Sequence, residues 1–325
     1  MTVVVTGATG HIGANLVRSL LQDGRKVRAV LHDDARALAG LDVEKVVGDV
    51  LEPESLKKAF AGAEVVYHLA ARISVTGDPD GMVRKTNVEG PRNVARASRE
   101  AGVRRLVHFS SIHAFRQSPL DQPLDETRAP AQTPRSLAYD RSKADGEQQV
   151  LAAVAEGLDA VIVNPSGVIG PYDFRPSRMG AVFVGLYQRR FPAMVEGGFN
   201  WVDVRDVVKS AMAAETKGRR GERYLLTGHY VPVQELAQMF GEVAGVRSPR
   251  LVSPMWLARI GAPFVTAYSQ VTRTTPLFTS ESLEALRANR NVRRDKAEKE
   301  LGHTARPTRE TLADTVEWFR QAKMI

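Results

Sequence analysis

Val3-Val4-Val5-Thr6-Gly7-Ala8-Thr9-Gly10-His11-Ile12-Gly13 joins an apolar run to the start of a helical segment through three glycines. Gly7 permits a turn where the strand ends, Gly10 lets the backbone approach a pyrophosphate, and Gly13 lets the helix pack closely on the strand. The N-terminus of that helix offers unpaired N–H groups and a partial positive charge to an anion. The stretch predicts a dinucleotide-binding loop, although the Gly-x-x-Gly-x-x-Gly spacing differs from the commoner Gly-x-Gly-x-x-Gly.

Short apolar runs alternate with longer helical segments through the first half of the chain. Such runs are typical of buried strands, and the helices between them supply the crossovers that parallel strands need. The runs cover residues 3–6, 27–31, 43–47, 65–69, 106–110 and 160–164, and the helical segments cover 12–23, 54–61, 87–101 and 139–156. The alternation predicts an α/β fold built on a doubly wound parallel sheet.

The regular alternation fades after the last of these runs, where prolines and glycines become frequent. We predict a dinucleotide-binding domain over residues 1–165, to which the chain returns at about 201–227 and 277–290. A smaller, discontinuous substrate lobe is expected over residues 166–200 and 228–276, together with the C-terminal helices. The ligand is expected in the crevice between the two lobes.

Composition narrows the class of protein. The chain has 325 residues, a net charge of +8 and no cysteine, which excludes disulfides and cysteine-ligated metals, and no metal is expected. The excess arginine is scattered without interleaved stacking aromatics, so no nucleic-acid partner is expected.

Residues 251–268 are interpreted as an amphipathic helix over a pocket rather than a membrane span, because they contain Pro254, Arg259 and Pro263. No signal peptide is recognised, and a cytoplasmic location is expected.

Ser111, Tyr139 and Lys143 form the candidate catalytic group. Ser111 follows a predicted strand, and the carboxyl ends of parallel strands face the ligand crevice. Tyr139 and Lys143 lie four residues apart on a predicted helix, so both side chains can point into that space. We expect Tyr139 to be the acid or base in a carbonyl/alcohol interconversion and Ser111 to donate a hydrogen bond to the substrate oxygen. Lys143 is expected to lower the pKa of Tyr139 and to bind the nicotinamide ribose.

Several segments together resemble the extended short-chain dehydrogenase/reductase superfamily, the NAD(P)-dependent epimerase/dehydratase family, over nearly the whole chain. The loop at residues 7–13 is similar to its cofactor loop, and Ser111, Tyr139 and Lys143 match its catalytic triad. The other matching segments are Gly48-Asp49-Val50, His68-Leu69-Ala70-Ala71, Thr86-Asn87-Val88-Glu89-Gly90 and Asn164-Pro165-Ser166-Gly167-Val168-Ile169-Gly170-Pro171. The last of these is most similar to the dihydroflavonol-reductase-like branch. The resemblance implies a Rossmann-type fold and a nicotinamide cofactor.

The resemblance also implies which residues contact that cofactor. They are Gly7, Thr9, Gly10, His11, Ile12, Gly13, Asp49, Val50, Leu69, Ala70, Ala71, Asn87, Tyr139, Lys143, Pro165, Gly167 and Val168. At the end of the second strand, Leu31-His32 stands where an acidic side chain would bind the ribose hydroxyl of NAD. His32 and Arg36 could instead meet a 2′-phosphate, so NADP is favoured and NAD is the alternative. His113 has no motif role and is interpreted as structural, with substrate contact as the alternative.

These residues predict an oxidoreductase that transfers a hydride between the nicotinamide cofactor and a carbonyl or secondary alcohol of a small organic substrate. The first alternative is a nucleotide-sugar epimerase or dehydratase, which regenerates its cofactor within one turnover. The second is a regulatory protein that binds the dinucleotide without turnover. The resemblance further suggests a homodimer through the helices near Asn87 and Tyr139.

Overall fold

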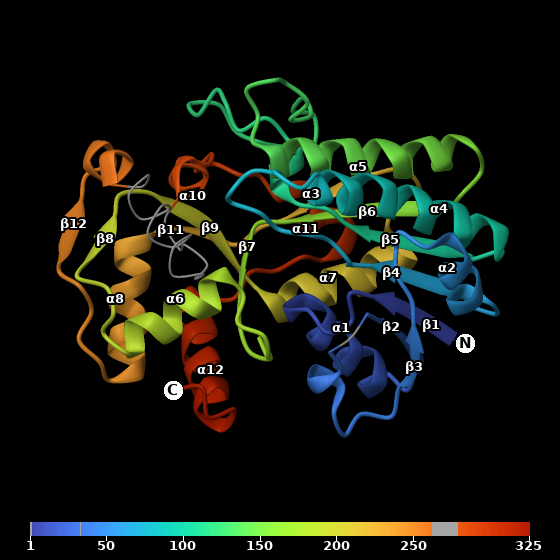
Figure 1. Ribbon diagram of the computed structural model, residues 1–325, viewed down its shortest axis with the longest axis horizontal. Helices are drawn as coiled ribbons and strands as arrows, with labels where there is room; N and C mark the ends of the chain where they lie inside the picture. Colours follow the sequence, from blue (N-terminus) through green and yellow to red (C-terminus); the bar gives the residue numbers. More distant parts are fainter. Residues whose placement is uncertain (1, 33, 262–278) are drawn as a thin grey trace.

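A seven-stranded parallel sheet forms the centre of the larger lobe (Figure 1). The computed structural model describes residues 2–32, 34–261 and 279–325. In sheet order the strands are β10 (Arg223–Leu226), β6 (Ala160–Pro165), β5 (Arg105–Phe109), β4 (Val65–His68), β1 (Thr2–Thr6), β2 (Lys26–Leu31) and β3 (Glu44–Val47). Neighbouring strands all pair in parallel, which confirms the doubly wound sheet predicted from the alternating runs.

Helices cover both faces of this sheet because the side chains of each strand alternate between the faces. Val3 and Val5 belong to the core beneath α1 (His11–Gln22), α7 (Val204–Lys217) and α11 (Asp295–Leu301). Val4 belongs to the core on the other face, beneath α2 (Pro53–Phe60), α4 (Gly90–Glu100) and α5 (Ala138–Ala155). The two apolar cores hold the carboxyl ends of the strands at one edge, where the site is built.

A separate apolar core lies in the smaller lobe, to the left in Figure 1. Its sheets have the orders β11-β9-β7 and β12-β8. The elements are β7 (Gly167–Ile169), α6 (Arg178–Tyr187), β8 (Ala193–Val195), β9 (Gly198–Asp203), β11 (His229–Pro232), α8 (Val233–Ala244), β12 (Leu251–Ser253), α10 (Ser280–Ala285) and α12 (Thr308–Gln321). Between β9 and β11 the chain crosses to the large lobe to form α7 and β10.

The helix predicted over residues 87–101 differs from a regular helix at its start. A three-residue helix, α3 (Met82–Arg84), leads into a π-helix, Lys85–Glu89, and only then into α4. The π-helical segment packs so tightly on α5 that a Cβ on Gly146 would lie 2.2 Å from the Asn87 carbonyl oxygen. π-helical turns occur frequently at functional sites.

The amphipathic helix predicted over 251–268 is only partly described. The segment begins as strand β12, and a helix follows over residues 255–261, while the remainder lies outside the described residues. Within the described chain, we find no helix that combines the length and apolar character of a membrane span.

Candidate active site

The three glycines of the N-terminal loop serve different purposes. Gly7 has a φ of +69°, and a Cβ there would lie 2.7 Å from the backbone nitrogen of Ala70. A Cβ on Gly13 would lie 2.2 Å from the Gly7 carbonyl oxygen, so helix α1 needs a glycine to pack on the turn. A Cβ on Gly10 would meet only that same oxygen, at 3.4 Å. The protein itself therefore has room at Gly10, and this open face of the loop fits a pyrophosphate.

The other predicted cofactor residues lie along the carboxyl edge of the sheet. His11 begins α1, and its Nε2 lies 3.1 Å from the carbonyl oxygens of both Gly170 and Pro171. The loop thus holds the segment that follows β7. The remaining residues lie in the first loop (Thr9), in the first turn of α1 (Ile12), after β3 (Asp49, Val50), after β4 (Leu69, Ala70, Ala71) and at β6 and β7 (Pro165, Gly167, Val168).

Asn87 acts within the protein as a clamp between two parts of the site. Its Oδ1 accepts a hydrogen bond from the Arg72 N–H at 2.8 Å, and its Nδ2 donates to the Arg72 carbonyl at 2.9 Å. The same Nδ2 donates to Ser142 Oγ at 2.9 Å. Asn87 therefore connects the loop after β4 to the helix that carries Tyr139 and Lys143.

Charged side chains gather at the end of β2, where the 2′-position of the cofactor was expected. Arg36 is exposed and pairs with Asp34 at 2.7 Å. His32 is also exposed, and its Nε2 lies 3.8 Å from Asp49 Oδ2. The Arg36 guanidinium thus forms an ion pair with a carboxylate of the protein itself. To bind a 2′-phosphate, it must give up this ion pair with Asp34.

Ser111, Tyr139 and Lys143 come together where β5 ends and α5 begins. The Ser111 carbonyl accepts a hydrogen bond from Asn164 Nδ2 at 3.0 Å, which fixes the end of this strand against β6. Lys143 is buried, and its Nζ donates to the Phe109 carbonyl at 3.0 Å. The Ser111 hydroxyl accepts a hydrogen bond from the His113 N–H at 3.2 Å, and it is close enough to the Tyr139 phenol to affect its pKa.

The electrostatics of this group differ from the expectation that Lys143 lowers the pKa of Tyr139. Burial, helped by the nearby Asp140 carboxylate, raises the pKa of Tyr139 to about 12, against a smaller opposite effect of Ser111. Burial also lowers the pKa of Lys143 to about 8, although Glu147 opposes this shift. In the protein without its cofactor, burial and Asp140 therefore decide the pKa of Tyr139, and Lys143 is not among the groups that shift it.

We expect Lys143→Met to stabilise the cofactor-free protein at pH 7. Burial lowers the pKa of Lys143 from 10.5 to about 8, and the charged lysine therefore destabilises the folded wild type at pH 7 by roughly 3 kcal/mol, since one pKa unit is about 1.4 kcal/mol. The lost hydrogen bond to Phe109 offsets about 1 kcal/mol of this gain. Between pH 8 and 10.5 Lys143 binds a proton in the unfolded chain but not in the folded protein, so the stability of the wild type rises with pH in this range. Above pH 10.5 the stability difference between the wild type and the variant that comes from this charge vanishes.

Urea unfolding of the cofactor-free variant at pH 7 and at pH 10 measures this difference. Lys45→Met, on exposed strand β3, is the matched control and should change stability little. A Lys143 variant less stable than the wild type at pH 7 would contradict the account of the buried charge.

His113 pairs with Asp140, the residue next to Tyr139. Its Nδ1 lies 3.3 Å from Asp140 Oδ1, and its ring centroid lies 6.1 Å from that of Tyr139 in an edge-on arrangement. Although burial opposes it, the Asp140 carboxylate raises the pKa of His113 above its usual range. His113 therefore lies against the carboxylate next to Tyr139, and it also faces open space.

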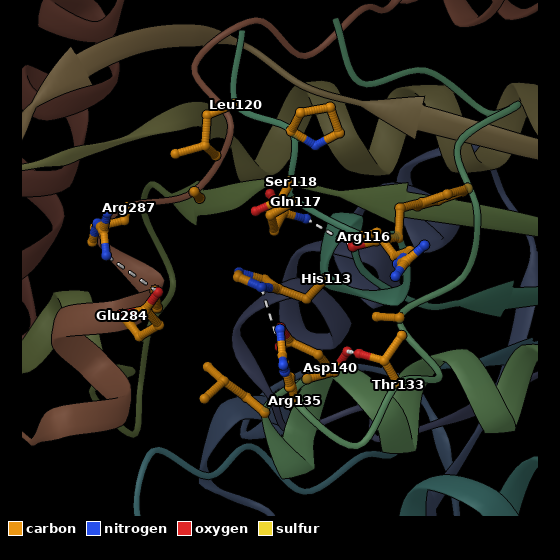
Figure 2. Close-up of a pocket in the computed structure, with 17 residues that line it drawn as sticks. His113, Arg116, Gln117, Ser118, Leu120, Thr133, Arg135, Asp140, Glu284 and Arg287 are labelled. Atoms are coloured by element: carbon orange, nitrogen blue, oxygen red, sulfur yellow. Dashed lines mark hydrogen bonds and ion pairs between the residues drawn. The ribbon is translucent and has the colours of Figure 1, made fainter. Parts of the chain in front are cut away.

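Two cavities adjoin His113 and share Ala285 as well. The outer cavity, of about 590 Å³, lies between the loop after β5, the start of α5 and residues 284–288. Figure 2 shows His113 in this cavity between Gln117 and Asp140, with Arg135 beside it and Arg287 across from it. A second, apolar pocket has a volume of about 220 Å³. One side of it is formed by His113, Ser166 and Gly167, and the other side by residues of the smaller lobe. Its apolar wall includes Met179, Val182, Met194, Phe199 and Trp201.

Arg178 is the residue of this region that the sequence analysis missed. It begins α6 and lines the apolar pocket. A single charge at the start of the otherwise uncharged helix Arg178–Tyr187 was the available signal. It was overlooked because the segment after β6 was interpreted only as loop-rich.

Comparison with known proteins places this site in a family. The sequence model of the NAD dependent epimerase/dehydratase family matches residues 3–227. Sterol demethylase protein B of Methylococcus capsulatus is 38% identical, and the alignment covers 100% of both chains. A protein of Synechocystis sp. provisionally named dihydroflavonol 4-reductase is 33% identical over 97% of this chain and 94% of its own. The crystal structure of gox2253 is 33% identical, with a TM-score of 0.86 over 100% of this chain and 99% of the other.

These likenesses extend over the whole chain, and the fold and the sequence motifs agree with them. The expected nicotinamide cofactor follows from the family, and the predicted oxidoreductase class is confirmed. The chain belongs to the NAD-dependent epimerase/dehydratase family, within the dihydroflavonol-reductase-like branch of the extended short-chain dehydrogenases/reductases, and is an NAD(P)-dependent oxidoreductase.

Proposed function

We propose that the protein interconverts a ketone and a secondary alcohol on an apolar, ring-containing substrate bound in the apolar pocket. One observation carries this proposal: the pocket and the Ser111, Tyr139 and Lys143 group meet at His113, whose ring lines the pocket and lies 6.1 Å from that of Tyr139. The names of the relatives point the same way, since they refer to a sterol and a dihydroflavonol, both ring systems.

The residues divide the chemistry of ketone reduction between them. The bound nicotinamide supplies the hydride. Tyr139, whose pKa of about 12 keeps the phenol protonated at neutral pH, donates the proton to the carbonyl oxygen. Ser111 donates a hydrogen bond to the same oxygen, where negative charge develops. Lys143, held by the Phe109 carbonyl one helical turn from Tyr139, binds the ribose hydroxyls.

We further propose NADP as the cofactor, bound by Gly10 and the other residues predicted above. Support comes from the exposed Arg36 and His32 at the end of β2, because a guanidinium pairs well with a phosphate. Residues 1–165 with the returns of the chain form the dinucleotide-binding domain in this proposal, and the rest forms the substrate lobe. A cytoplasmic location and a homodimer through α4 and α5 stay predictions.

Cofactor consumption tests the proposed function. We expect a fused-ring ketone such as a tetralone to cause steady NADPH oxidation, faster than NADH oxidation, with the alcohol as product. UDP-glucose should give neither a net absorbance change nor an epimerised sugar. An epimerised sugar, with cofactor retained by the protein, would support the epimerase alternative. Dinucleotide binding without turnover of any carbonyl would support the regulatory one.

A further inference from the structure

Arg178 carries a charge that nothing in the described chain neutralises. No hydrogen bond or ion pair joins its guanidinium to any described residue, and burial lowers the pKa of Arg178 below its usual range. Its neighbour in sequence, Asp173, is buried and accepts hydrogen bonds at 2.9 and 2.8 Å from the Ser177 N–H. Burial costs this cation part of its hydration, and an anionic ligand could supply the missing partner.

The position of Arg178 adds to that cost. It is the first residue of α6, where the helix dipole disfavours a positive charge. One of the N-terminal N–H groups is already bound, because Ser177 Oγ accepts a hydrogen bond from the Gly180 N–H at 3.1 Å. The guanidinium is the charged group at this helix end for which the described chain supplies no partner.

The wall of the apolar pocket shows what kind of partner fits. Among the described residues, Arg178 and His113 are its only charged or titratable side chains, and no carboxylate lines it. His113 is engaged with Asp140 at 3.3 Å, on the side toward Tyr139. The rest of the wall is mostly aliphatic and aromatic, with Met194 and Trp201 almost fully buried.

We infer that Arg178 binds an acidic group of the substrate, so that the substrate is an apolar ring ketone or alcohol that carries a carboxylate. The reacting oxygen lies toward Ser111 and Tyr139, and the carboxylate pairs with the guanidinium from α6. Arg is suited to this task because its planar fork can bind both carboxylate oxygens. The location of the reacting oxygen rests on the proposed function, whereas the acid site does not.

Matched keto acids and their methyl esters test this inference. Tetralones with a carboxylate at different ring positions, each beside its methyl ester, are assayed for kcat/KM with NADPH. For at least one position the wild type should prefer the acid, and Arg178→Gln should reduce the acid-to-ester ratio about ten- to hundredfold, mainly through the KM of the acid. Arg178→Lys should restore part of the ratio. Arg116→Gln, in the outer cavity, is the matched control and should leave the ratio unchanged.

Calorimetry on the NADP-bound enzyme separates this inference from the proposed function. Binding of an acid that weakens about ten- to hundredfold in Arg178→Gln, without turnover of any ketone, would support the acid site and contradict the proposed reaction. Equal reduction of acids and esters by the wild type, or a ratio unchanged by Arg178→Gln, would overturn the acid site alone. No binding of any acid, together with no reduction of any ketone, acid or ester, would overturn both.

Discussion

Tyr139→Phe should lower kcat for ketone reduction by about two to four orders of magnitude, the usual contribution of a positioned acid. The substitution removes the hydroxyl that donates the proton but keeps the half-buried ring, so the packing beside His113 should survive. The pKa of about 12 means that the wild-type phenol holds its proton throughout the neutral range. Stopped-flow measurement of NADPH oxidation with a reactive ketone reports the change in kcat.

Dinucleotide binding should persist in the Tyr139 variant, because the glycine loop lies at a different strand. Tyr187→Phe, at the end of α6, is the matched control and should retain wild-type turnover. If the Tyr139 variant turned over at the wild-type rate, proton donation would have to come from another group.

Gly10→Ala should weaken dinucleotide binding at least a hundredfold while the protein remains folded. The structure gives the reason for both halves of this expectation. An added Cβ would lie 3.4 Å from the Gly7 carbonyl oxygen, a contact that the protein can accommodate with a small shift. The same Cβ would occupy the open side of the loop, where the pyrophosphate has to approach the backbone. Isothermal calorimetry gives the affinity, and circular dichroism checks the fold.

Gly13→Ala provides the contrasting variant three residues away. Its Cβ would lie 2.2 Å from the Gly7 carbonyl oxygen, so the backbone itself must move, and we expect a loss of several kcal/mol of stability. Unchanged affinity in the Gly10 variant would show that the pyrophosphate does not contact this part of the loop.

The sheet and the meeting of Ser111, Tyr139 and Lys143 at its edge were predictable because their signals are local. A buried parallel strand needs a short run of apolar residues, and the runs that include Val3 and Val161 carry this signature by themselves. Ser111, Tyr139 and Lys143 were found because the end of a strand and the first turns of a helix constrain their positions. Local pattern therefore fixed both the edge of the sheet and the residues gathered there.

The partners of these residues were not predictable, since they depend on packing between distant segments. Nothing in the sequence around Asp140 indicates that its carboxylate faces His113, which lies in a short 3₁₀ helix 27 positions earlier. The raised pKa of Tyr139 was not predictable for the same reason: the burial of the phenol beside Asp140 arises only when α5 packs on β5. Arg178 stayed unnoticed until the second lobe placed α6 beside the pocket.

The wide turn at Lys85–Glu89 makes the number of residues there as important as their identity. Removing one residue would let the chain close as an ordinary α-helix, but it would rotate the preceding side chains by about 100° around the helix axis. The Asn87 side chain would then lose its hydrogen bonds with both Arg72 and Ser142. The extra residue of the π-helical turn therefore sets the rotational phase of the helix. Because of this phase, the Asn87 side chain can bridge the loop after β4 and the helix α5 that carries Tyr139.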